Sequence, residues 1–200
     1  ERGSGAGRLL FVEVARIAEW IYPAITRLYQ FEPKEKYNFI IRDTDDYSNG
    51  GAYYYDNKIE IWAENLDFEL RGTHHWLKNV VTHEFTHMIS LQSSFKFGRK
   101  IPAGYLQVIS YEQEKRPDVI YGFPNILASY PVPGMTIPAW FAEGVAQYQT
   151  RDLPFENWDS HRDMILRDRA LSHKILSLSS MGTFGKESIG NESVYNQGYS

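Results

Sequence analysis

Apolar residues recur along the chain at two spacings, which predict an alternation of helices and strands. Between Arg8 and Phe31 they return every three or four residues, the period of a helix with one buried face. Pro23 falls inside this range, so we expect either a kink or two helices that meet there. Residues 1–7 are rich in glycine and are expected to form a loose N-terminus. The residues that set the helical spacing are Leu10, Val14, Ile17, Ile21, Ile25 and Leu28.

The pattern then changes to one that favours strands. Residues 37–42 are rich in β-forming side chains, and 49–51 read Asn-Gly-Gly, a turn signal. Residues 52–55 and 58–62 are predicted to form a hairpin. Gly51 and Ala52 carry little or no side chain, so an extended peptide could pair with the backbone of this first strand. An ordinary hairpin without a ligand fits the same residues.

The helical period returns in the middle and at the end of the chain. Thr73 is a candidate N-cap for a helix that runs to about Gln92. Further helices are predicted at 138–148 and 160–171, and another begins near residue 193. In the helix at 160–171 four residues are expected to face inward. They are Met164, Ile165, Leu166 and Leu171.

Residues 93–137 show no clear period and are rich in Gly, Pro and Tyr. We expect an irregular insertion there, with a short helix at 101–110. Long irregular connections are often functional, so this one is either a lid or cleft wall, or a peripheral insertion.

The helix that follows Thr73 contains His83-Glu84-Phe85-Thr86-His87. Residues four apart stack on one face of a helix, so His83 and His87 can bind one metal ion from the same side. Glu84 leans over that site and is placed to deprotonate a metal-bound water. This arrangement is typical of zinc metalloproteases. A surface helix that carries these residues by chance is the alternative.

A catalytic zinc requires three protein ligands, and the helix at 138–148 offers the third. Glu143 lies there among apolar residues, where a carboxylate is costly unless it is paired or binds a metal. We therefore predict that His83, His87 and Glu143 bind one Zn²⁺; a Glu143 paired with an Arg or Lys is the alternative. Gln147 shares the face of Glu143 and could hydrogen-bond a ligating His. The expected packing residues are Trp140, Phe141, Val145 and Tyr148.

Composition excludes several classes of function. With 42% hydrophobic and 15% aromatic residues, the chain can bury a sizeable core. Its net charge of −4 and the lack of a basic stripe argue against nucleic acid as a partner. The absence of cysteine excludes thiol catalysis, thiolate ligands and disulfides. No run of apolar residues is long enough to span a membrane.

The motifs at 83–87 and 140–144 together resemble the gluzincin metallopeptidases, above all the peptidase MA-like catalytic domain, a relative of the thermolysin and aminopeptidase N groups. The resemblance implies an α+β, thermolysin-like fold. In it, a small mixed sheet with an edge hairpin packs against the zinc-bearing helix, and a mostly helical second half follows. It implies Zn²⁺ on His83, His87 and Glu143, with Glu84 as the general base. The long interval between His87 and Glu143 suits the MA-like group.

Two further assignments are implied by the resemblance alone. Residues 194–198 resemble the Tyr-x-Lys-Gly stretch of aminopeptidase N-like enzymes, which makes Tyr195 the residue that steadies the oxyanion, although Gln197 replaces the Lys. Residues 49–52 stand in chain order where those enzymes have their substrate-binding edge strand, which gives Gly51 and Ala52 a substrate-binding role. The Met-Glu-Asn that holds a substrate amine is missing, and this favours an endopeptidase.

We therefore expect one catalytic domain over residues 1–200 that hydrolyses peptide bonds in a peptide or protein substrate, using a zinc-bound water activated by Glu84. The alternatives are a zinc hydrolase acting on a non-peptide bond and an inactive interaction module with the same fold. Members of the MA-like group are often bacterial, exported and followed by a β-propeller. The resemblance thus implies a periplasmic, cell-surface or secreted protein. The chain lacks an initial Met and a signal-like segment, so we expect a piece of a longer protein.

Overall fold

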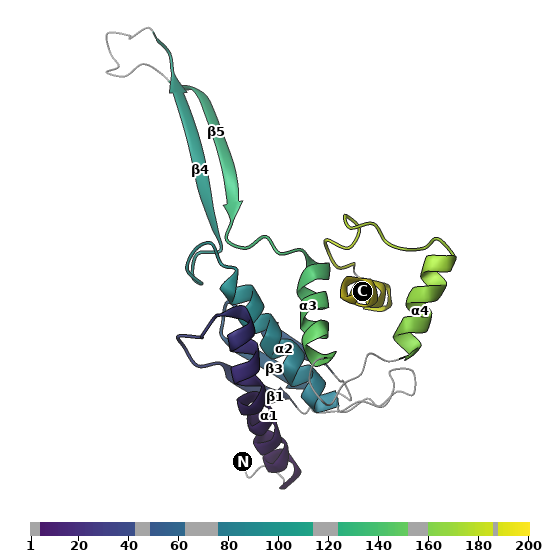
Figure 1. The fold of residues 1–200 in the computed structure, drawn as a ribbon. Helices are drawn as coiled ribbons and strands as arrows, with labels where there is room; N and C mark the ends of the chain where they lie inside the picture. Colours follow the sequence, from purple (N-terminus) through teal and green to yellow (C-terminus); the bar gives the residue numbers. More distant parts are fainter. Residues whose placement is uncertain (1–4, 43–48, 63–75, 114–123, 152–159, 186–187) are drawn as a thin grey trace. The chain divides into compact units, whose positions relative to one another are not determined.

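The computed structural model describes residues 5–42, 49–62, 76–113, 124–151, 160–185 and 188–200 (Figure 1). The chain forms two compact units. Glu1–Ser94 and Ile137–Ser200 make up the first, here called the helical unit, and Phe95–Thr136 make up the second, the hairpin unit. The helices are α1 (Gly5–Tyr29), α2 (Trp76–Ser93), α3 (Ala139–Arg151), α4 (Ser160–Leu171) and α5 (Ser188–Tyr199). The strands are β1 (Asn38–Arg42), β2 (Gly50–Tyr53), β3 (Lys58–Trp62), β4 (Ala103–Tyr111) and β5 (Pro124–Pro133).

Helix α1 confirms the first predicted helix and runs as one element through Pro23. The predicted spacing lines up four fully buried side chains on one face of α1, whereas Leu28 at its end is exposed. The helix already begins at Gly5, so the prediction of a loose N-terminus was wrong for residues 5–7, and residues 1–4 lie outside the described part of the chain. The buried face consists of Val14, Ile17, Ile21 and Ile25.

The three predicted strands form one small mixed sheet of order β1-β3-β2. Strand β1 pairs in parallel with β3, and β2 pairs with β3 in antiparallel fashion as the predicted hairpin. Ile59 and Ile61 of the central strand are fully buried, which fixes the side of the sheet that faces the core. The sheet and the helices together confirm the α+β class. Strand β2 is left at an edge of the sheet.

Helix α2 lies between α1 and the sheet and joins them into one core. The rings of Tyr22 and Tyr37 approach Phe85 of α2 with centroids 6.0 and 5.9 Å apart. Val81, Met88 and Ile89 of the same helix are fully buried. The helix is thus fixed along its length by packing, as a helix that positions a site must be. The candidate N-cap Thr73 lies outside the described residues.

The C-terminal part of the helical unit is helical, as expected, but two details differ. Met164 and Leu171 of α4 are 58% and 76% exposed, so their predicted inward orientation was wrong. Charged residues lie all around this short helix, and it makes few contacts, so it buries only a narrow stripe. Phe141 and Tyr148 of α3 are also about half exposed and are not the core residues that were predicted.

The hairpin unit overturns the expected irregular insertion at 93–137. Residues 103–111 form a long strand rather than a short helix, and this strand pairs in antiparallel register with β5. The prediction failed because both faces of β4 carry apolar side chains, so the alternation that marks a half-buried strand is missing. No helix in the described part of the chain has the length and apolar character needed to cross a membrane.

Candidate metal centre

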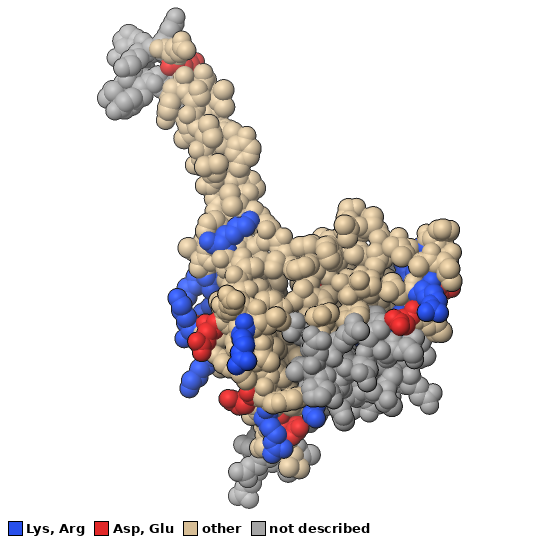
Figure 2. All heavy atoms as spheres, viewed as in Figure 1, with Lys and Arg blue, Asp and Glu red and all other residues tan. Residues whose placement is uncertain are grey.

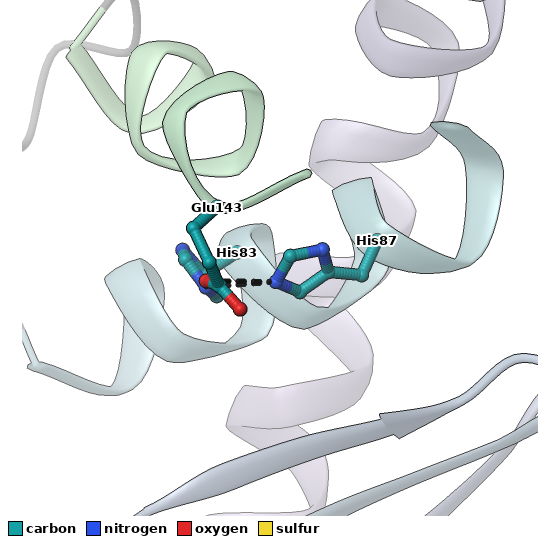
Figure 3. A group of neighbouring side chains, drawn as sticks. All are labelled: His83, His87 and Glu143. Atoms are coloured by element: carbon teal, nitrogen blue, oxygen red, sulfur yellow. Dashed lines mark hydrogen bonds and ion pairs between the residues drawn. The ribbon is translucent and has the colours of Figure 1, made fainter. Parts of the chain in front are cut away.

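Three side chains from two helices meet at one point of the helical unit (Figure 3). The Nε2 atoms of His83 and His87 lie 3.0 Å apart, which follows from their spacing of one turn on α2. Oε2 of Glu143, on α3, lies 3.0 Å from His83 Nε2 and 3.2 Å from His87 Nε2. The three residues form a group whose donor atoms could hold one metal ion.

The spacing of these three atoms fits a zinc ion. Ligands about 2.0–2.1 Å from a tetrahedral Zn²⁺ are separated from one another by about 3.3 Å. The observed separations of 3.0–3.2 Å form a nearly equilateral triangle of about that size. Three electron-rich atoms pointed at one spot repel one another unless they share a proton or a cation. A fourth position, on the side away from the triangle, is the one that a catalytic zinc leaves to water or substrate.

Burial and hydrogen bonding keep the third ligand anionic. Burial alone would raise the pKa of Glu143, which is 9% exposed. The hydrogen bonds from the imidazoles of His83 and His87 outweigh that effect, and the pKa of the Glu143 carboxyl lies well below its usual range. A carboxylate that stays charged in a buried place is a suitable ligand for a divalent cation.

Glu84 stands beside this triangle, on the side of the sheet. Burial raises the pKa of Glu84, whose side chain is largely withdrawn from solvent. The neighbouring imidazoles of His83 and His87 act in the opposite direction, as does a hydrogen bond from the backbone of Ala52 in β2. A buried carboxyl with a raised pKa, held by one backbone donor, has the properties of a general base.

Strand β2 approaches α2 closely because position 50 is a glycine. A Cβ atom at Gly50 would clash with the side chain of Val80 and would lie 2.7 Å from Cγ and Oε1 of Glu84. Gly50 was predicted only as part of a turn, and its role in this approach was missed. The residues predicted to bind substrate, Gly51 and Ala52, follow it directly in the same edge strand.

A second close approach, between α3 and α5, was also missed. A Cβ atom at Gly144 would clash with the backbone carbonyl of Gly198, and one at Gly198 would lie 2.5 Å from the carbonyl oxygen of Trp140. Gly144 immediately follows the candidate ligand Glu143, so the backbone that carries this ligand rests directly on α5. The signal in the sequence was the glycine at the end of each of the two motifs at 140–144 and 194–198.

Tyr195 lies on α5, the helix that is packed against α3 through these glycines. Its ring stacks on Phe184, with centroids 5.6 Å apart and planes at 18°. Gln197, which stands in place of the Lys of the resembled motif, bonds through its amide to both backbone groups of Leu176 at 2.8 and 2.7 Å. That residue therefore anchors the segment before α5. The oxyanion role of Tyr195 stays a prediction.

Gln147 was predicted to hydrogen-bond a ligating imidazole, and both its partner and the state of the His87 ring bear on that prediction. Oε1 of Gln147 accepts a hydrogen bond of 2.6 Å from Arg162 of α4, a partner other than the predicted imidazole. Nδ1 of His87 is buried and has no hydrogen-bond partner among the described residues. The hydrogen bond between Gln147 and a ligating imidazole stays a prediction.

Comparisons with family models, with curated proteins and with solved structures give no match for this chain. The residues of the chain and their geometry are therefore what indicates its function.

Proposed function

We propose that this chain is a zinc metallopeptidase of the gluzincin type, with a thermolysin-like arrangement of sheet and helices in its helical unit. The observation that carries the proposal is the triangle of His83 Nε2, His87 Nε2 and Glu143 Oε2, with sides of 3.0–3.2 Å. The buried Glu84 beside it supplies a base that is not itself a member of the triangle. A chance pair of His on a surface helix would bring neither a third ligand nor a buried carboxyl.

In this proposal the chain separates binding from proton transfer. His83, His87 and Glu143 hold the ion, and the anionic Glu143 offsets part of its charge. Bound Zn²⁺ supplies Lewis-acid chemistry, polarising a carbonyl and lowering the pKa of water toward about 7. Glu84 accepts a proton from the attacking water and passes it to the nitrogen of the leaving amine. The backbone bond from Ala52 holds the Glu84 carboxyl in place for both transfers.

The edge strand β2 gives this site a way to bind an extended peptide. Its partner β3 lies on one side only, so the other edge of β2 pairs with no strand of the described sheet. A substrate strand paired with Gly51 and Ala52 would lie next to Glu84, because Gly50 brings β2 against that residue. The substrate we propose is therefore a peptide segment in extended form, cut within the chain, and Tyr195 is the proposed donor to the oxyanion.

Two measurements on the same preparation test this function. Elemental analysis should find about one equivalent of zinc per chain, as three protein ligands to one ion require. A library of peptides should be cleaved at internal bonds, and a chelator should abolish the cleavage. Folded protein that binds no zinc would refute the metal site. Protein that binds zinc but cleaves no peptide would instead indicate a different substrate bond or an interaction module.

A further inference from the structure

The β4–β5 hairpin exposes an unusual amount of apolar surface. Its strands contain no Lys, Arg, Asp or Glu, and in Figure 2 the surface along them is uncharged. Tyr105, Leu106 and Leu127 are 71%, 60% and 67% exposed. An isolated two-stranded hairpin is marginal in water, and large exposed apolar patches mark interaction sites. The other large exposed side chains of the hairpin are Val108, Ile109, Tyr111, Ile126 and Tyr130.

The pairing register divides this surface into two faces of different character. Successive residues of a strand point to opposite faces. One, here called the Leu106 face, is apolar except for Ser110 and the hydroxyl group of Tyr130. The other, the Gln107 face, carries Gln107 opposite Ser129 in its middle and two tyrosine hydroxyls besides. The cross-strand pairs of the Leu106 face are Gly104–Val132, Leu106–Tyr130, Val108–Ala128 and Ser110–Ile126.

Basic residues stand at the start of the hairpin. Lys96, Arg99 and Lys100 precede β4, whereas Glu112 is the single acidic residue among the described residues of this unit. Lys96 and Lys100 are exposed. This excess of positive charge contrasts with the net charge of −4 for the whole chain. An apolar surface next to basic side chains is complementary to an anionic lipid surface.

We propose that the hairpin is a membrane-surface anchor that lies in the interface of an anionic bilayer. The Leu106 face enters the boundary of the acyl chains. The amide and hydroxyl groups of the Gln107 face remain at the level of the headgroups, where Tyr side chains are favoured. The open edges of the two strands also stay hydrated there, which the hydrocarbon core would not permit. Lys96 and Lys100 contact the anionic headgroups.

The charge of the hairpin unit favours a lipid surface over a second copy of the chain as the partner of the hairpin. Pairing two hairpins face to face would cover the same uncharged surface, but the uncharged strands of the second copy would supply no negative charge to Lys96 and Lys100. The edge of β5 is also poorly suited to pairing with another strand, because Pro131 and Pro133 lack the N–H that a ladder needs. Neither feature weakens a lipid contact. The proposal does not depend on the metal centre.

Flotation of the full chain with vesicles tests the proposal. Vesicles of phosphatidylcholine mixed with phosphatidylserine should carry the protein, and vesicles of phosphatidylcholine alone should carry much less. Leu106→Asp should weaken binding about tenfold or more, from the loss of one buried apolar side chain. Leu171→Asp is the matched control, because Leu171 is 76% exposed on α4, and it should bind like the wild type.

The basic residues and the two faces are tested separately. Lys96→Glu with Lys100→Glu should reduce binding to the anionic vesicles by about fivefold or more per residue. Lys34→Glu with Lys36→Glu changes the same charge at exposed positions of the helical unit and should have little effect. The chain has no cysteine, so Val108→Cys and Gln107→Cys give single labelling sites on opposite faces for an environment-sensitive fluorophore. With vesicles, the emission at position 108 should increase several-fold more than at 107.

Three outcomes would overturn the proposal that the hairpin is a membrane-surface anchor. The wild type could fail to float with either kind of vesicle. Leu171→Asp could lose binding as strongly as Leu106→Asp. Sedimentation without lipid could reveal a self-associated form that Leu106→Asp converts to monomer, which would make a second copy the occupant. If Leu106→Asp unfolds the hairpin, the lysine variants and the two labelled cysteines still test membrane binding. The lysines lie before β4, and the cysteines replace exposed side chains, so these changes should leave the hairpin folded.

Discussion

Helix α2 and the β4–β5 hairpin invert the usual distribution of polar and apolar residues. The middle of α2 is buried although it is rich in polar residues, whereas the hairpin is exposed although its strands carry no charge. Core packing explains neither arrangement, because buried polar groups are costly and exposed apolar patches favour association. Both regions are therefore where we infer binding: a cation at α2 and a lipid surface at the hairpin. The buried polar residues of α2 are Asn79, Thr82, Glu84, Thr86, His87 and Ser90.

The largest expected effect concerns the buried carboxyl beside the triangle. Glu84→Gln removes a base but no ligand, so peptide cleavage should fall by about 10²–10⁴-fold while zinc remains bound. Glu143→Gln is the contrasting variant, because it should lower the affinity for zinc itself. Measuring kcat and zinc content for both variants separates the roles. Near-normal cleavage by Glu84→Gln would show that Glu84 is not the general base, and the burial of its carboxyl would then have no functional explanation.

The next effect concerns Tyr195 on the helix packed against the ligand-bearing α3. Tyr195→Phe removes the hydroxyl and keeps the ring that stacks on Phe184. If the hydroxyl stabilises the oxyanion, kcat should fall by about 10²-fold, with KM and zinc content nearly unchanged. Tyr148→Phe on α3 is a control that should leave kcat unaltered. A loss of stability without a loss of kcat would indicate a structural tyrosine.

The contact of α3 with α5 should be sensitive to a single methyl group. Gly144→Ala places a Cβ against the carbonyl of Gly198, so it should destabilise the fold by about 1–3 kcal/mol. Because residue 144 follows Glu143, zinc affinity should fall as well. Denaturant unfolding and zinc titration measure the two effects. Gly98→Ala is the control, since a Cβ there meets no atom within 4 Å and should change neither quantity.

The contrast between the two regions also explains what the sequence could predict. Leu77, Val81, Phe85 and Met88 of α2 recur at helical spacing, and the spacing of His83 and His87 is local, so the meeting of the two imidazoles was predictable. The third ligand, Glu143, was predicted because an isolated carboxylate among apolar residues is costly. The strands β4 and β5 were missed because apolar residues on both faces erase the alternation. Gly144 and Gly198 are visible in the sequence as the glycines that end the two motifs, but their meeting depends on how two helices cross, which no local pattern encodes.

The smallest expected effect is on the pH dependence of stability, and it arises from the different partners of two buried carboxylates. Glu143 is stabilised by imidazoles at the proposed metal site, whereas Glu60 of β3 is satisfied by side chains near the surface. Glu60 is 3% exposed, and its carboxyl accepts a hydrogen bond of 2.7 Å from Arg42 and contacts Lys58 at 2.8 Å. The hydrogen bonds from Arg42 and from Lys58 lower the pKa of Glu60 to about 2.

This shift predicts how stability depends on acid. The folded-state pKa of Glu60 lies below its unfolded value of 4.5, so the unfolded chain binds the proton first. The stabilising contribution of Glu60 is therefore fully present above about pH 4.5 and is lost as the pH falls toward about 2. Glu60→Gln should be less stable than the wild type at neutral pH, and the difference should shrink through this window. Urea unfolding at a series of pH values measures it, and subtraction cancels the groups that both proteins share. Glu13→Gln, which removes an exposed ion pair with Arg16, should show almost no such dependence. A difference between wild type and Glu60→Gln that stays constant from neutral pH to pH 2 would show that the carboxylate charge of Glu60 does not stabilise the sheet.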